Sequence, residues 1–136
     1  MVGDLLNGRT IHSIIKCLSL FPNNTLYLLS PKQLRLSNKD LEEAKKRKIK
    51  LVEIKSFEEI PADCHFWYWT RVQKERFTDK REYEKLKLTF ILTKKLVEKK
   101  AGKNTLIMHP LPRVGEIETA VDTDPLAVYL TTEPKN

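Results

Sequence analysis

The sequence predicts an α/β fold, a three-layer, Rossmann-like parallel sheet with helices on both faces. Short apolar runs alternate along the chain with amphipathic or charged segments, and loops rich in glycine, proline and arginine follow several of these runs. Alternation of this kind is typical of parallel strands joined by helical crossovers. The chain has 136 residues, enough for one such domain with its own core.

The apolar pattern assigns the elements in chain order. An apolar face from Ile11 to Phe21 predicts a helix that Pro22 ends. Helices are also expected over 38–48, with Ser37 or Asn38 as the cap, and over 80–87 and 93–100. Strands are expected over 25–29, 51–54, 65–69 and 105–108.

The two ends of the chain are unusual for a free-standing domain. Only Met1 and Val2 precede the Gly3-Asp4 turn, where a full first strand is expected, and no closing helix is expected after Glu133. We therefore expect residues 1–136 to be one domain of a larger protein.

Charge and composition exclude several classes of protein. Lys and Arg number 25 against 18 Asp and Glu, which gives a net charge of +7. No apolar run approaches the roughly 20 residues of a membrane-spanning helix, and the start lacks a signal-peptide pattern. Cys17 and Cys64 have no CxxC spacing and are expected to be reduced thiols of a cytoplasmic protein.

The positive charge leaves a nucleic-acid-binding module open as an alternative. Against it, the aromatic residues at 66–69 fall in a predicted buried strand, and the lysines alternate with glutamates on helix faces. No nucleic acid and no membrane are therefore expected as partners.

Three loops are expected at the carboxyl ends of the strands, where parallel sheets gather their chemistry: 3–10, 70–76 and 109–116. In the first loop, Arg9 and Thr10 begin a helix, whose N-terminus attracts anions. In the second, Arg71 and Gln73 lie two residues apart, so both are expected on the same side of an extended stretch, and Glu75 is placed to hold Arg71.

The third loop places prolines at 110 and 112, and its carbonyl groups are free of a strand ladder and able to accept from an amine. The three histidines lie far apart in the sequence, so no metal site is expected. The residues alone indicate a site for a small dicarboxylate-like anion, with ordinary solvated turns as the alternative.

Together the three loops resemble one family. The motifs are GDLxxGRTxHS at 3–13, TRVQKERF at 70–77 and HPLPRVxEI at 109–117. In this order they are similar to the C-terminal half of aspartate carbamoyltransferase, and the resemblance runs over essentially the whole chain. It implies that 1–136 is the aspartate-binding domain, with the carbamoyl-phosphate domain and the final helix absent.

The resemblance also implies the roles of individual residues. Arg9 matches the arginine that grips chiefly the α-carboxylate of aspartate, while Arg71 and Gln73 match the pair that fixes the side-chain carboxylate. Leu111 and Pro112 match positions whose backbone carbonyls receive the carbamoyl amide and the attacking amine, across a peptide bond that is cis in the family. Thr10, Glu75 and Glu116 match the supporting residues, with Glu75 and Glu116 orienting Arg71.

The implied reaction transfers a carbamoyl group from carbamoyl phosphate to L-aspartate, in pyrimidine synthesis, with no cofactor. The implied partner is a homotrimer of the full-length chain, with or without regulatory chains or fused pathway domains. Two positions depart from the family: Leu6 stands where Lys is common, and Gly115 where Asp is usual. They leave open a non-catalytic homologue that acts as an assembly or regulatory partner.

Overall fold

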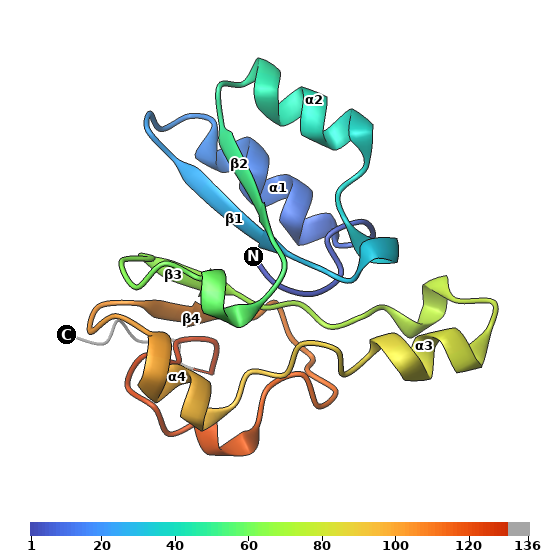
Figure 1. Ribbon diagram of the computed structural model, residues 1–136, viewed down its shortest axis with the longest axis vertical. Helices are drawn as coiled ribbons and strands as arrows, with labels where there is room; N and C mark the ends of the chain where they lie inside the picture. Colours follow the sequence, from blue (N-terminus) through green and yellow to red (C-terminus); the bar gives the residue numbers. More distant parts are fainter. Residues whose placement is uncertain (131–136) are drawn as a thin grey trace.

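The computed structural model describes residues 1–130 and contains the predicted alternation of helices and strands (Figure 1). The helices and strands, in chain order, are α1 (Arg9–Leu18), β1 (Thr25–Leu29), α2 (Asn38–Lys46), β2 (Lys50–Ile54), β3 (Phe66–Tyr68), α3 (Lys80–Leu86), α4 (Lys94–Lys100) and β4 (Leu106–Met108). The expectation for the end of the chain after Glu133 concerns residues outside this described range.

Two pairs of parallel strands form the sheet. β1 pairs with β2, and β3 pairs with β4, both in parallel register. Val2 lies between the pairs and makes parallel bridges to Leu29 on one side and to Trp69 on the other. The strands therefore lie side by side in the order β2, β1, the Val2 segment, β3 and β4.

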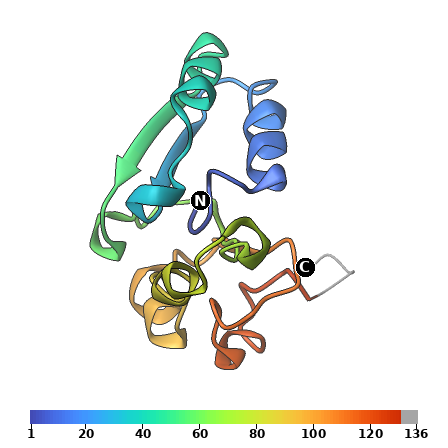
Figure 2. The same cartoon turned by 90° about the vertical axis from the view of Figure 1, so that its right-hand side faces the viewer.

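Helices cover both faces of these strands, as the predicted three layers require (Figures 1 and 2). Because side chains alternate along a strand, one face of β1 carries Leu26 and Leu28. These pack in one buried cluster with apolar residues of α1 and α2, namely Ile11, Ile15 and Ala44. Trp67 and Trp69 of the opposite face pack in a second cluster with Leu96 and Val97 of α4.

The burial of the aromatic strand argues against the nucleic-acid alternative. Trp67 is 4% exposed and Trp69 is fully buried, with its indole N–H donating to the carbonyl of Phe90 at 3.0 Å. Stacking on nucleic-acid bases needs exposed ring faces, which these two residues do not offer.

The first helix ends earlier than its apolar pattern predicts. α1 stops at Leu18, and both Leu20 and Phe21 are exposed, at 79% and 61%. The side-chain amide of Asn24 donates to the carbonyls of Leu18 and Phe21, at 2.8 and 2.9 Å, which stabilises a turn before Pro22. Thus the helix ends before Pro22, and the predicted apolar face runs three residues beyond the last residue of α1.

The remaining elements agree with prediction to within two residues at each end. Ser37 caps α2, because its hydroxyl oxygen accepts from the backbone N–H of Asp40 at 3.2 Å. Cys17 and Cys64 are both free, as expected. No helix within residues 1–130 is both long and apolar enough to span a membrane.

Candidate functional site

A cavity of about 570 Å³ opens where the three predicted loops meet. Its lining contains almost every site residue singled out from the sequence, in three groups: Gly8–Thr10, residues 70–76 apart from Val72 and Lys74, and His109–Pro112. Arg9 and Arg71 line this one cavity together, as predicted. Glu116 alone among the predicted site residues lies outside the lining.

Close contact between the first two loops depends on glycine. Gly3 has a φ of +113°, and a Cβ at this position would lie 2.1 Å from the carbonyl oxygen of Thr70. Both the positive φ and the close approach exclude a side chain here. The backbone of Gly3 can therefore lie directly against the start of the second loop.

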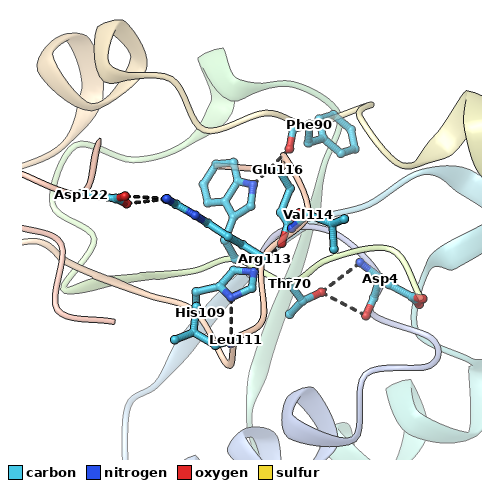
Figure 3. Close-up of polar contacts among 10 residues, drawn as sticks. Asp4, Thr70, Phe90, His109, Leu111, Arg113, Val114, Glu116 and Asp122 are labelled. Carbon is cyan, nitrogen blue, oxygen red and sulfur yellow. Dashed lines mark hydrogen bonds and ion pairs between the residues drawn. The ribbon is translucent and has the colours of Figure 1, made fainter. Parts of the chain in front are cut away.

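Asp4 joins the same two loops from within the core and is fully buried. One carboxylate oxygen accepts from the backbone N–H of Asn7 at 2.9 Å, and the other from that of Gln73 at 3.3 Å. The backbone N–H of Asp4 also donates to the hydroxyl of Thr70 at 3.1 Å (Figure 3). Asp4 is assigned no role from the sequence, although an acidic residue in the turn after the Met1–Val2 segment is a visible signal.

Arg71 is held as predicted by Glu75. Its two terminal nitrogens donate to the two carboxylate oxygens at 2.7 and 3.3 Å. The hydrogen bond to Glu75 raises the pKa of Arg71, and the same bond lowers the pKa of the Glu75 carboxyl. Arg71 is therefore a fixed cation at the wall of the cavity, with a planar donor fork suited to carboxylates.

Gln73 also lines the cavity, but its amide is turned to the first loop. The side-chain Nε2 donates to the carbonyl of Asn7 at 2.9 Å. Gln73 and Arg71 are expected on one side of an extended stretch. Both residues do line the same cavity, but the amide of Gln73 is bonded to the first loop.

The third loop is shaped by a buried pair at its two ends, His109 and Glu116 (Figure 3). His109 Nε2 lies 2.7 Å from a carboxylate oxygen of Glu116, while His109 Nδ1 accepts from the backbone N–H of Leu111 at 2.9 Å. Because Nδ1 is an acceptor, Nε2 carries the proton that is donated to Glu116. Leu111 has a φ of +46°, and the Leu111–Pro112 peptide bond is cis, as predicted.

Glu116, which is expected to help orient Arg71, makes its hydrogen bonds within the third loop. Its second oxygen accepts from the backbone N–H of Val114 at 2.8 Å, so both oxygens serve the third loop. Burial acts to raise the pKa of Glu116, but the hydrogen bonds from His109 and Val114 outweigh it, and the pKa lies below its usual value. Among residues 1–130, Glu75 is the acidic residue that pairs with Arg71, while the charge of Glu116 raises the pKa of Arg71 without a hydrogen bond.

The chemistry of the cavity is that of an anion site with acceptors at one wall. Three arginines, at 9, 71 and 76, face one glutamate among the lining residues. Residues His109 to Pro112 line the same cavity, and backbone carbonyls are groups able to accept hydrogen bonds from amines or amides. Within residues 1–130 no group of three or more His, Cys, Asp and Glu side chains could hold a metal ion.

Comparisons with known proteins find relatives that match most of this chain. The model of the family described as "Aspartate/ornithine carbamoyltransferase, Asp/Orn binding domain" matches residues 1–133. The aspartate carbamoyltransferase catalytic subunit of Methanocaldococcus jannaschii is 48% identical over 128 residues, which is 94% of this chain and 41% of that protein. The corresponding subunit of Alkaliphilus oremlandii is 48% identical over 129 residues, 93% of this chain and 38% of that protein.

Solved structures show the same likeness. The M. jannaschii catalytic subunit superposes with a TM-score of 0.84 and 48% identity, over 94% of this chain and 42% of that chain. The Trypanosoma cruzi aspartate transcarbamoylase in complex with carbamoyl phosphate and aspartate gives a TM-score of 0.81 at 30% identity, over 94% of this chain and 43% of that one. The chain thus spans about two fifths of the length of these relatives.

Proposed function

Because the chain belongs to the aspartate/ornithine carbamoyltransferases, through their Asp/Orn binding domain, we propose that residues 1–136 form the aspartate-binding part of an aspartate carbamoyltransferase. One observation carries the proposal. Arg9 and Arg71, from loops far apart in the sequence, line the same cavity as the Leu111–Pro112 segment. This brings two cations and a set of carbonyl acceptors around one small volume.

In this proposal the two arginines clamp the two carboxylates of aspartate. Arg9, in the first turn of α1, takes chiefly the α-carboxylate, with the helix N-terminus adding to the attraction. Arg71, together with Gln73, takes the side-chain carboxylate. The backbone carbonyls of Leu111 and Pro112 accept from the attacking amine and from the carbamoyl amide.

Three further residues position these groups. Glu75 fixes the guanidinium plane of Arg71, and Thr10 lines the cavity beside Arg9. Glu116 acts through His109, whose ring accepts from the N–H of Leu111 and so sets the course of the third loop.

Aspartate, rather than ornithine, fits the charges of the lining. The side chain of ornithine ends in an ammonium, which the arginines at 9, 71 and 76 would repel, whereas the side-chain carboxylate of aspartate is attracted. The T. cruzi relative has been solved with carbamoyl phosphate and aspartate, which supports the same choice.

The proposed reaction is carbamoyl transfer without a cofactor. The aspartate amine attacks the carbamoyl carbon of carbamoyl phosphate; a C–N bond forms, the C–O bond to phosphate breaks, and phosphate leaves with the bonding pair and takes the proton that the amine loses. The residues of this chain contribute orientation, since two clamped carboxylates hold the amine in line for attack. We assign carbamoyl phosphate mainly to the part of the enzyme beyond this chain and expect the chain alone to be inactive.

The setting follows from the family and forms part of the proposal. The reaction belongs to pyrimidine biosynthesis in the cytoplasm, and the full-length chain is expected to form a homotrimer, with or without regulatory chains or fused pathway domains.

Ligand titration followed by NMR tests the aspartate site, because it detects weak binding by a single domain. We expect L-aspartate to shift backbone signals of the 70–76 and 109–112 loops, and L-asparagine and L-ornithine to shift them far less. Arg71→Ala should weaken aspartate binding by at least about tenfold, since a hydrogen bond to a charged group contributes about 1.5–3 kcal/mol.

Arg81→Ala is the matched control, because Arg81 is exposed on α3, away from the cavity lining. Equal binding of aspartate and asparagine, or equal effects of the two arginine substitutions, would refute the assignment of Arg71 to the side-chain carboxylate.

A further inference from the structure

Packing requires glycine at position 8, the residue that precedes α1. Its carbonyl accepts from the N–H groups of Ile11 and His12, at 3.0 and 3.4 Å. A Cβ on residue 8 would lie 2.8 Å from the carbonyl oxygen of Asp4 and 2.9 Å from Cγ1 of Ile11. Any larger residue would force these groups apart, so whatever residue stands at position 7 is followed by a glycine.

Residue 7 is asparagine, and Asn7-Gly8 is the only Asn-Gly pair of the sequence. The backbone nitrogen that follows an asparagine can attack the carbon of the side-chain amide, and glycine hinders this attack least because it has no Cβ. Within residues 1–130 the N–H of Gly8 donates no hydrogen bond, so its nitrogen is not held by another acceptor. Asn7 itself is half-buried and so partly open to solvent.

Asp4 opposes this reaction by holding the amide of Asn7. The side-chain Nδ2 donates to both carboxylate oxygens of Asp4, at 3.1 and 3.2 Å, and the backbone N–H of Asn7 donates to one of them at 2.9 Å. Hydrogen bonds to a charged acceptor are the stronger ones. Because Nδ2 is the atom that must leave, the amide has to break its bonds with Asp4 before it can react.

We propose that Asn7 is a modification site, that its deamidation to aspartate or isoaspartate disables the aspartate cavity, and that Asp4 sets the rate. In the first step the nitrogen of Gly8 bonds to Cγ of Asn7 and gives up its proton. The Cγ–Nδ2 bond breaks, and the amide nitrogen leaves as ammonia with that proton. Water then opens the resulting five-membered imide, since its hydroxyl adds to one of the two carbonyl carbons and its proton goes to the ring nitrogen. Opening at Cγ gives aspartate, and opening at the backbone carbonyl gives isoaspartate.

The aspartate product would replace two hydrogen bonds by a repulsion. Asp4 is fully buried, and the new carboxylate would stand where the donating amide now contacts it. Two carboxylates this close oppose each other's ionisation, and a buried charge that loses its partner is strongly destabilising. The carboxylate of Asp4 also accepts from the backbone N–H of Gln73 at 3.3 Å, so the second loop is released together with the first.

The isoaspartate product would also shift the backbone. In isoaspartate the main chain runs through the side-chain carbon, which adds one carbon between Cα of residue 7 and Gly8. Arg9 follows directly, in the first turn of α1, and lines the aspartate cavity. The loss of aspartate binding rests on the function proposed above, whereas the reaction at Asn7 does not.

Peptide mass mapping of the chain during incubation at pH 8 tests the reaction, because deamidation replaces an NH2 by an OH. We expect Asn7 of the folded chain to convert faster than the asparagines at 23, 24, 38 and 104, none of which precedes glycine. It should convert at least about tenfold more slowly than in the same chain unfolded in guanidinium chloride, where the bonds with Asp4 are absent. If Asn7 converts only in the unfolded chain, it is not a modification site of the folded protein.

Variants of Asp4 test its control of the rate. Asp4→Ala removes the acceptor, and Asp4→Asn removes its charge at nearly the same size, so both should speed the conversion of Asn7 by at least about threefold. Val121→Ala is the matched control, because Val121 is fully buried in a cluster that does not include Asn7, and its truncation lowers stability elsewhere. Equal rates in the Asp4 variants and the unmodified chain, or an equal increase in Val121→Ala, would overturn the role of Asp4.

Asn7→Asp tests the consequence directly, with Asn104→Asp, in an exposed turn, as its control. Asn7→Asp should unfold at a lower urea concentration than the control, and its aspartate binding, followed by NMR, should be at least about tenfold weaker. Equal stability would overturn the repulsion with Asp4, and equal binding would overturn the effect on the cavity. If even the unmodified chain binds no aspartate, the proposed function fails, while the mass mapping and the urea unfolding still decide the role of Asn7.

Discussion

Replacing Asp4 by alanine should uncouple the first two loops of the aspartate cavity. The carboxylate accepts from the N–H groups of Asn7 and Gln73 and from the side-chain amide of Asn7, at 2.9, 3.3 and 3.1 Å. Hydrogen bonds to a charged group contribute about 1.5–3 kcal/mol each, and a buried donor left unpaired costs about 1–3 kcal/mol. With partial compensation by water at the half-buried donors, Asp4→Ala should lower the free energy of unfolding by about 2–5 kcal/mol.

Urea unfolding at pH 7, followed by tryptophan fluorescence, measures this change. Asp4→Asn keeps one acceptor oxygen and the size of the side chain, so it should cost less than the alanine variant. Asp63→Ala is the control, because Asp63 is exposed. Aspartate binding should fall in Asp4→Ala even where the protein is fully folded, since the backbone of Gln73 loses its fixed position.

The reasoning about Asp4 would be refuted if Asp4→Ala unfolded within about 0.5 kcal/mol of the unmodified chain, the range of ordinary surface substitutions. It would also be refuted if folded Asp4→Ala bound aspartate as well as the control.

Two further results are expected. Gly3→Ala should destabilise the fold by at least about 2 kcal/mol more than Gly115→Ala in urea unfolding, because both positions have positive φ but only at Gly3 would a Cβ meet a carbonyl, that of Thr70, at 2.1 Å. The native pKa of Glu116 lies below its ordinary value of 4.5, so its contribution to the free energy of unfolding is present above that value and is lost as the pH falls through the native pKa. In Glu116→Gln the free energy of unfolding should therefore depend less on pH, which urea unfolding between pH 3 and 6 measures. An unchanged dependence on pH would contradict this.

The layers and most element boundaries could be predicted from the sequence because they follow from local periodicity. A short apolar run is enough to predict the strand at 25–29, and a capping serine before a charged segment is enough to predict the helix after Ser37. The early end of α1 could not be predicted, since it depends on hydrogen bonds from Asn24, beyond the helix. The pairing of Val2 with both Leu29 and Trp69 could not be predicted either, because a single residue shows no periodic pattern.

The cationic part of the candidate site was predictable for a related reason. Arg9 and Arg71 lie in the loops after two strand segments, and parallel strands bring their carboxyl ends to one edge of the sheet. The buried supports were not predictable, because their partners come from tertiary packing. Glu116, expected to help orient Arg71, pairs with His109, and the carboxylate of Asp4 accepts from the backbone of the second loop.

The pairing of Val2 with both halves of the sheet has a consequence for the order of folding. β1 with β2, and β3 with β4, each close over a crossover of their own, so both pairs can form from nearby sequence. Val2 is synthesised before either pair, yet its second partner exists only after Trp69 has been added to the growing chain. A segment made before both strand pairs therefore completes the sheet after them, and the middle of the finished domain is where its assembly ends.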